Sequence, residues 1–309
     1  MRRALLCVTL LLLLPGLWKA PRVDAGGTGQ QAATSPPHHE ATLPSGYAGS
    51  EACEPCHQDL VGKFSENPHT RMALMHGGKG VTCENCHGPG QAHIEGGGDV
   101  TKIFRFSEAS AKLIDAKCLE CHAGAHPNFD RSAHGEAKVS CTSCHSVHKF
   151  ATEESLLKVA QPQLCYTCHT DVKPAFAQPF HHRVDEGLMS CSDCHDPHGT
   201  FQPNQLRISS TQDAICTKCH VETAGPFVYE HPPIKTEGCT SCHSPHGSPN
   251  PRLLKVSNIN HLCLQCHSPS MNFTAPGTPS FHNMANQYQA CTVCHVQIHG
   301  SNVDSSFFK

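Results

Sequence analysis

The chain has 309 residues, with 23 lysines and arginines against 26 aspartates and glutamates, and a formal net charge of −3. A mildly acidic chain does not suit nucleic acid, whose phosphates select basic surfaces. Only 6% of the residues are aromatic, so side chains alone cannot build the core expected at this length.

The first 25 residues have the pattern of a secretory signal peptide. Arg2 and Arg3 are basic, residues 4–17 are apolar, and small residues near Ala25 suit cleavage. An uncleaved anchor is the alternative, although the apolar run is shorter than a typical membrane span. No other segment resembles a membrane span, so we expect the processed chain outside the cytoplasm without a transmembrane segment of its own. Processing removes four basic residues, one acidic residue and Cys7, which leaves 20 cysteines and a net charge of about −6.

Residues 26–46 are rich in glycine, proline, serine and threonine and show no apolar period. This composition predicts a flexible leader. The remaining residues, 47–309, are expected to form one cytochrome domain.

Ten copies of the pentapeptide Cys-x-x-Cys-His follow, and this spacing is the attachment site for c-type haem. Two thiols bind the porphyrin and the adjoining imidazole reaches the iron. The ten motifs are Cys53-Cys56-His57, Cys83-Cys86-His87, Cys118-Cys121-His122, Cys141-Cys144-His145, Cys165-Cys168-His169, Cys191-Cys194-His195, Cys216-Cys219-His220, Cys239-Cys242-His243, Cys263-Cys266-His267 and Cys291-Cys294-His295.

Two other readings of paired cysteines are zinc sites and disulfides. Neither explains why histidine follows all ten pairs, since chance would place one there about one time in twelve. Ten covalently bound haems c are therefore predicted, and the porphyrins must supply the core that the side chains lack.

The motifs come in pairs, and the pairs repeat along the chain. The first motifs of successive pairs begin at Cys53, Cys118, Cys165, Cys216 and Cys263. Such a period indicates a repeat architecture in which each unit packs on its neighbours. The predicted fold is a multihaem cytochrome c, elongated and mostly of irregular loops with short α-helices wrapped around a chain of haems. Its five dihaem modules, numbered 1 to 5 below, span about residues 47–106, 107–151, 152–204, 205–254 and 255–309.

A short helix is expected before the first motif of each module, with Ser50, Thr211 and Ser257 as candidate N-caps and Pro162 as a candidate first helical residue. Each module also carries a loop histidine between its two motifs and a trailing histidine after the second. These ten residues are the candidate distal ligands: His69 and His93, His134 and His148, His182 and His198, His231 and His246, and His282 and His299. His181 competes with His182, whereas His76, His126 and His261 break the pattern and are read as surface residues or propionate partners.

Proximal His195 and trailing His198 are only three residues apart, so they cannot easily reach opposite faces of one iron. His198 should therefore ligate a different haem. If that haem belongs to the same module, each module is a cross-ligated pair; ligation to the next module is the alternative.

Iron with two histidine ligands has no open position, and methionine as a distal ligand would raise its potential. The five methionines left after processing recur at no fixed place in the modules, which favours bis-histidine ligation. We find no catalytic constellation, and none of the motifs has lysine in place of the proximal histidine.

Several stretches resemble the periplasmic decahaem cytochromes of the DmsE/MtrA type. They are Cys-Glu-Asn-Cys-His-Gly-Pro-Gly from Cys83, Ser-Cys-Thr-Ser-Cys-His-Ser-Val-His from Ser140, Cys-Ser-Asp-Cys-His-Asp-Pro-His-Gly from Cys191, and the ending from Cys291. The resemblance implies a periplasmic haem wire associated with the outer membrane. Its implied partners are an inner-membrane quinol-oxidising cytochrome, an outer-membrane β-barrel, and an extracellular cytochrome or reductase. Electrons would flow outward, as in respiration of metals or other extracellular acceptors, or inward, as in iron oxidation.

Two alternatives from other classes remain. A freely diffusing periplasmic storage or shuttle cytochrome would carry the same haems without entering a barrel. A multihaem nitrite or hydroxylamine-type oxidoreductase would need at least one iron with an open position.

Overall fold

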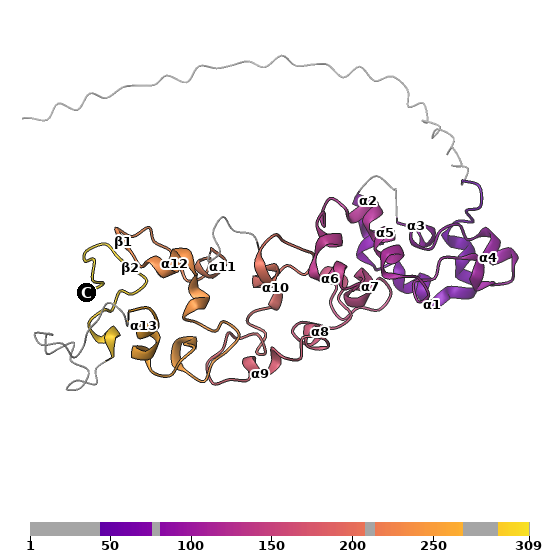
Figure 1. Cartoon of the computed structure of the whole chain (residues 1–309). Helices are drawn as coiled ribbons and strands as arrows, with labels where there is room; N and C mark the ends of the chain where they lie inside the picture. Colours follow the sequence, from indigo (N-terminus) through magenta and orange to yellow (C-terminus); the bar gives the residue numbers. More distant parts are fainter. Residues whose placement is uncertain (1–43, 76–80, 208–213, 268–289, 309) are drawn as a thin grey trace, which may run out of the picture. The chain divides into compact units, whose positions relative to one another are not determined.

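The structure is a computed structural model that describes residues 44–75, 81–207, 214–267 and 290–308 (Figure 1). The signal peptide, most of the leader, the N-cap candidate Thr211, and the histidines His76 and His282 lie outside these ranges. Backbone contacts group the chain from Leu43 onward into one unit.

Short helices joined by long irregular loops make up the described part of the chain (Figure 1). The α-helices are α1 (Glu54–Phe64), α2 (Pro68–Met75), α3 (Cys83–His87), α4 (Gln91–Glu95), α5 (Ala111–His122), α6 (Ala133–Glu136), α7 (Cys141–Cys144), α8 (Gln163–Tyr166), α9 (Lys173–Phe176), α10 (Cys191–Cys194), α11 (Ala214–Thr217), α12 (Pro232–Thr236) and α13 (Ile259–His267). The 3-10 turns are η1 (Ser50–Cys53), η2 (Val100–Lys102), η3 (Phe129–Arg131), η4 (Glu154–Leu156), η5 (Pro203–Gln205), η6 (Val221–Thr223), η7 (Cys239–Ser241), η8 (Pro251–Leu253) and η10 (Cys291–Val293).

The second motif of every module begins a helical turn at its first cysteine. These turns are α3, α7, α10, η7 and η10, and they begin at Cys83, Cys141, Cys191, Cys239 and Cys291. Thr82 and Ser190 precede two of them and form capping boxes with Asn85 and Asp193. A helical turn places two side chains three positions apart on one face, which suits two thiols that bind one porphyrin.

The helix starts differ from the N-cap expectations. Ser50 is the first residue of η1 and follows its N-cap, Gly49. In front of α13 the side chain of Asn258, not Ser257, accepts the N–H of Asn260 at 3.0 Å. Pro162 is the N-cap of α8 instead of its first helical residue. In such short helices a one-residue shift of the cap is enough to defeat a sequence pattern.

Buried apolar side chains are few in the described ranges. They are Ile114, Phe129, Leu156, Tyr166, Phe176 and Val184, and only Tyr166, Phe176 and Val184 form a cluster. A protein of this length ordinarily buries far more. The observation agrees with a core made of porphyrins and not of side chains.

Neighbouring modules meet where the trailing segment of one lies on the loop of the module before it. We call this contact the clasp. Between modules 3 and 4, Phe180 and Ser248 exchange both backbone hydrogen bonds, at 3.2 and 2.8 Å. Between modules 4 and 5, strands β1 (Tyr229–Glu230) and β2 (Gly300–Ser301) pair antiparallel (Figure 1).

Glycine allows the close approach between modules 3 and 4 and between modules 2 and 3. A Cβ on Gly247 would lie 1.8 Å from the carbonyl oxygen of Ala175, and one on Gly199 would lie 2.9 Å from that of Asn128. Gly199 also has a φ of +111°, which L side chains rarely adopt. Each glycine directly follows a trailing histidine, so the close approach fixes the backbone position of that histidine.

Candidate haem-binding sites

Histidine rings from distant parts of the sequence face each other in pairs. Ten histidine pairs in the described ranges have ring centroids 6.0 to 6.5 Å apart, and nine of them join one motif histidine to one of the ten candidate distal histidines. The nine are His57 and His93 (6.5 Å), His69 and His122 (6.1 Å), His87 and His148 (6.2 Å), His134 and His169 (6.0 Å), His145 and His198 (6.0 Å), His182 and His220 (6.2 Å), His195 and His246 (6.0 Å), His231 and His267 (6.3 Å), and His243 and His299 (6.2 Å). The tenth pair, His122 and His126 (6.3 Å), includes no distal candidate.

The separation has a simple physical meaning. A bond from a metal ion to an imidazole nitrogen is about 2 Å long, and the ring centre lies roughly 1 Å behind that nitrogen. Two imidazoles on opposite sides of one iron therefore have centroids about 6 Å apart. The nine pairs leave the space that a haem iron needs, so the residues present fit the group that the motifs predict.

The pairing runs between modules, not within them. Each loop histidine of modules 1 to 4 faces the first motif of the next module, as His134 faces His169. Each trailing histidine of modules 2 to 5 faces the second motif of the module before it, as His198 faces His145. Among these nine pairs, only His57 and His93 lie inside one module. The hypothesis of cross-ligated pairs closed within each module is thus not what the internal modules show; neighbours exchange histidines instead.

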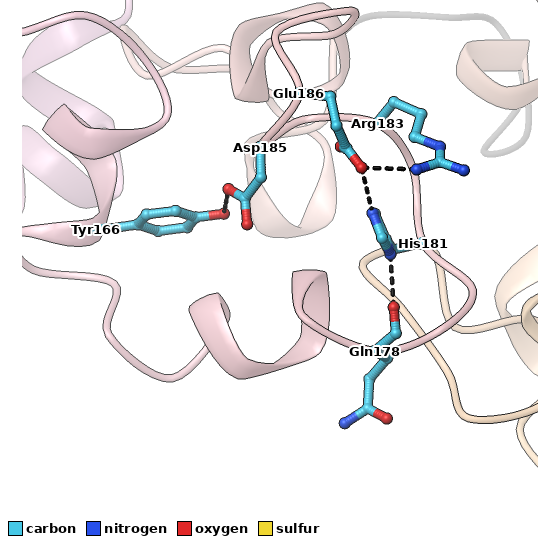
Figure 2. Close-up of polar contacts among 6 residues, drawn as sticks. All are labelled: Tyr166, Gln178, His181, Arg183, Asp185 and Glu186. Atoms are coloured by element: carbon cyan, nitrogen blue, oxygen red, sulfur yellow. Dashed lines mark hydrogen bonds and ion pairs between the residues drawn. The ribbon is translucent and has the colours of Figure 1, made fainter.

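The structure distinguishes His181 from His182. The His182 ring faces His220, and its Nδ1 donates to the carbonyl of Pro245 at 2.6 Å. In contrast, His181 binds Glu186 through Nε2 at 3.0 Å and the carbonyl of Gln178 through Nδ1 at 2.6 Å (Figure 2). Both ring nitrogens of His181 are occupied, so His182 is the candidate ligand.

Charge reinforces the separate role of His181. Its hydrogen bond with Glu186 raises the pKa of the imidazole. The bonds from His181 and Arg183 lower the pKa of Glu186 to about 2 (Figure 2). The three side chains form a surface ion-pair network next to the ligand pair.

His126 lies closer to the candidate ligands than its irregular position in the sequence suggests. Its ring is 6.3 Å from that of His122 and 3.9 Å from that of His198. The His126 ring therefore packs against His198, the distal candidate opposite His145, and also lies near His122. His261, the other irregular histidine in the described ranges, is exposed.

Backbone carbonyls hold the second-motif histidines in one tautomer. The Nδ1 atoms of His87, His145, His195, His243 and His295 lie 2.5 to 3.0 Å from the carbonyl oxygens of Phe104, Ser155, Asn204, Arg252 and Ser306. A carbonyl only accepts, so Nδ1 carries the proton and Nε2 is free to bind iron.

Three of these carbonyls belong to residues with left-handed backbone, Ser155, Asn204 and Arg252, with φ of +66°, +54° and +59°. Such values are uncommon outside glycine and are retained where the surroundings require them. The repeated ending Leu157-Lys158, Leu206-Arg207 and Leu254-Lys255 follows each of them in the sequence. That repeat is a sequence signal from which these carbonyls could be predicted, although it lies outside the haem motifs.

Burial favours the neutral form of the distal candidates. It lowers the pKa of His198 to about 4, with the neighbouring His126 as the next cause. Burial is also the first cause of the lowered pKa of His69, His148, His231, His246 and His299. Neutral imidazole is the form that binds metal.

The cysteine sulfurs connect one motif to the next. Within modules 1, 2, 3 and 5 the first thiols of the two motifs hydrogen-bond each other: Cys53 with Cys83, Cys118 with Cys141, Cys165 with Cys191, and Cys263 with Cys291. For Cys53, burial and then Cys83 raise the pKa to about 11. In the haem-loaded protein these sulfurs are thioethers, so the hydrogen bonds mark closeness and not a persisting contact.

The same closeness joins neighbouring modules. Burial raises the pKa of Cys86, and the thiols of Cys118 and Cys121 in module 2 raise it further. The pKa of Cys194 is also raised, first by burial and then by the Cys216 thiol of module 4. Neighbouring motifs therefore approach each other in sequence order at these junctions.

A polar side chain before the first motif binds the backbone of the second. The Oδ1 atoms of Asp115 and Asn260 accept the N–H of Cys141 and Cys291, each at 2.8 Å. Both residues stand three positions before the first cysteine of their module, as does Ser50, whose Oγ lies 3.4 Å from the N–H of Cys83. The haem motifs themselves do not indicate this position, although its regular offset from the first cysteine is visible in the sequence.

No helix in the described ranges is long and apolar enough to cross a membrane.

Comparison with known proteins identifies the family of the paired motifs. The doubled CXXCH motif family (Paired_CXXCH_1) matches residues 134–174, 181–225 and 231–272. Multiheme cytochrome MtrA of Shewanella baltica is 35% identical over 292 residues, which cover 87% of this chain and 85% of that protein.

Two other relatives match over shorter lengths. C-type polyheme cytochrome OmcC of Geobacter sulfurreducens is 30% identical over 58% of this chain and 27% of its own length. Cytochrome c-type protein NrfB of Escherichia coli O6:H1 is 33% identical over 39% of this chain and 65% of its own length. With its paired haem c motifs, its short helices and long loops, and its match along most of both chains, this protein belongs to the MtrA-type family of multihaem c-type cytochromes, which transfer electrons.

Proposed function

We propose that this chain carries electrons across the periplasm and through an outer-membrane β-barrel, for exchange with an extracellular acceptor or donor. The observation that carries the proposal is the series of facing histidine pairs that link each module to the next. Membership of the MtrA-type family supports the barrel and the outer-membrane location. The partners would be the barrel, an inner-membrane quinol-oxidising cytochrome and an extracellular cytochrome or reductase.

The proposed cofactors are ten haems c, attached through the twenty motif cysteines. The ten motif histidines would be proximal ligands. The distal ligands would be His93, His69, His148, His134, His198, His182, His246, His231 and His299 in the nine pairs described above. His282 lies outside the described residues and is proposed as the partner of His295, since it alone of the distal candidates has no counterpart among the nine pairs.

The proposed domain limits are a signal peptide at residues 1–25, a leader at 26–46 and the cytochrome domain at 47–309, with the five modules given above. Exchange of histidines between modules would hold them in sequence order, and the approach of sulfurs from neighbouring motifs supports the same order. The chain would then lead electrons from one module to the next.

We also propose that the protein is not an enzyme. Haem iron with two imidazole ligands takes up and releases one electron and has no position for a substrate. The side chains that would enforce this are the facing pairs, and in several of them a carbonyl oxygen holds Nδ1 and leaves Nε2 as the atom for iron, as in His134 and His182.

Spectra and mass test the ligand set. The haem-loaded protein should weigh ten haems more than the processed chain and show only low-spin signals in electronic and electron paramagnetic resonance spectra. A clear high-spin signal in the oxidised protein would favour the oxidoreductase alternative and contradict the ligand assignment.

Co-purification tests the location. An affinity-tagged chain expressed in its native host should be recovered from the outer-membrane fraction with a β-barrel protein, and it should be protected from external protease. Recovery only in the soluble periplasmic fraction, with all haems low-spin, would overturn the barrel proposal and favour the storage or shuttle cytochrome.

A further inference from the structure

The first cysteine of the second motif is held by a charged side chain in module 2 and by a neutral one in module 5. In module 2, Asp115 of α5 accepts the N–H of Cys141 at the start of α7. In module 5, Asn260 of α13 accepts the N–H of Cys291 at the start of η10. The two bonds have the same length, 2.8 Å, and join the same positions of the repeat.

Both side chains are removed from solvent. Asp115 is 7% exposed and Asn260 is 6% exposed. Aspartate and asparagine have the same shape, so the two modules differ at this point by one buried negative charge. A buried charge is screened far less than a surface charge and acts more strongly on its neighbours.

The charge of Asp115 reaches both haem-attachment points of module 2. The pKa of Cys141 is raised first by its hydrogen bond with Cys118, then by burial and by Asp115. Cys118 has a lowered pKa because of its bond with Cys141, and the charge of Asp115 opposes that lowering. One of these sulfurs belongs to each motif of the module, so the carboxylate lies beside both sites.

We propose that Asp115 lowers the reduction potentials of the two haems of module 2, and that the neutral Asn260 leaves those of module 5 higher. A fixed negative charge stabilises the oxidised iron, which carries one more positive charge than the reduced iron. The side chain before the first motif thus combines two roles: it positions the second motif and sets the local potential. The inference rests on the proposed haem attachment and ligation and does not depend on the barrel.

A reciprocal exchange in the full haem-loaded chain tests the proposal. Asp115→Asn keeps the acceptor oxygen and removes the charge, and Asn260→Asp does the reverse. In a spectroelectrochemical titration with small mediators, Asp115→Asn should move about a fifth of the absorbance change, two haems of ten, to higher potential by about 59 mV, a tenfold change in a one-electron equilibrium. Asn260→Asp should move a similar fraction to lower potential.

Asp130→Asn is the matched control, because it removes an exposed carboxylate from the same module. Its shift should be much smaller, since solvent and salt screen the charge. Equal shifts in Asp115→Asn and Asp130→Asn, or shifts of the same sign in the two reciprocal variants, would overturn the inference. Mass and low-spin spectra of each variant separate this outcome from a failure of haem attachment or ligation, which would contradict the proposed function itself.

Discussion

Individual histidines differ in what their sequence position reveals. The proximal histidines and the cysteines could be predicted from the sequence because haem attachment requires them to be contiguous. Distal candidates could be found only as a recurring set, since a distal ligand meets its iron through space. His181 and His182 are equivalent in the sequence, and only the hydrogen bonds of His181 to Glu186 and Gln178 distinguish them.

Alanine substitutions at these two positions should have unequal effects. His182→Ala removes the ring that faces His220, so one haem should become high-spin in the oxidised protein. His181→Ala breaks the ion pair with Glu186 and should leave every haem low-spin. Electron paramagnetic resonance of the purified variants measures both results. A high-spin signal in His181→Ala and not in His182→Ala would reverse the assignment.

His198→Met should raise the potential of one haem, the one attached at Cys141 and Cys144, because methionine is a weaker donor to ferric iron than imidazole. Electron passage along the chain should slow as a result. Potentiometric titration and stopped-flow reduction measure the two effects. His261→Met is the control at an exposed histidine and should change neither; equal changes at both positions would contradict the role of His198.

At the scale of elements, the sequence predicts short helices at the motifs but not the contacts between them. The repeat shows which segments are equivalent, and it does not show which neighbour each segment touches. The clasp illustrates this limit, because Gly247 and Ala175 lie far apart in the sequence and meet only through backbone approach. For Asp115 and Asn260 the sequence gives more, because their constant offset from the first motif is visible there. Their role is shown only by the hydrogen bonds that they accept from Cys141 and Cys291 in the structure.

Gly247→Ala should disrupt the clasp between modules 3 and 4. The added Cβ would collide with the carbonyl of Ala175, and the overpacking should destabilise the region by roughly 1–3 kcal/mol. His246 directly precedes Gly247, so the His246 ring should lose its position opposite His195 and a partial high-spin signal should appear.

Gly124→Ala provides the comparison, because a Cβ there meets no atom within 4 Å. That variant should keep the thermal stability and spectra of the parent protein. If both variants behave like the parent protein, the close approach at Gly247 is not needed for ligation.

For the whole molecule, the five modules and their order of repetition could be predicted, whereas the exchange of histidines between them could not. Both arrangements, within a module and between modules, satisfy the same count of ligands. Which of the two arrangements forms depends on the side of each motif along which the next segment passes. The short loops have similar compositions, so the sequence does not indicate that side.

Truncation distinguishes the two arrangements. Removing residues 255–309 deletes module 5 and with it His299, which faces His243. The shortened protein should carry eight haems, one of them high-spin, and added imidazole should convert that one to low-spin. Eight haems that are all low-spin before imidazole is added would show that modules close on themselves.

The exchange of histidines also bears on how such a chain can evolve. Each internal boundary pairs a loop histidine with the next first motif and a second motif with the next trailing histidine, as at His134 with His169 and His145 with His198. Boundaries built alike can be duplicated or deleted in register, and every iron of the recombined chain still finds two imidazoles. Unequal crossing-over between repeats of 47 to 51 residues would thus lengthen or shorten the protein by two haems at a time, without a non-functional intermediate.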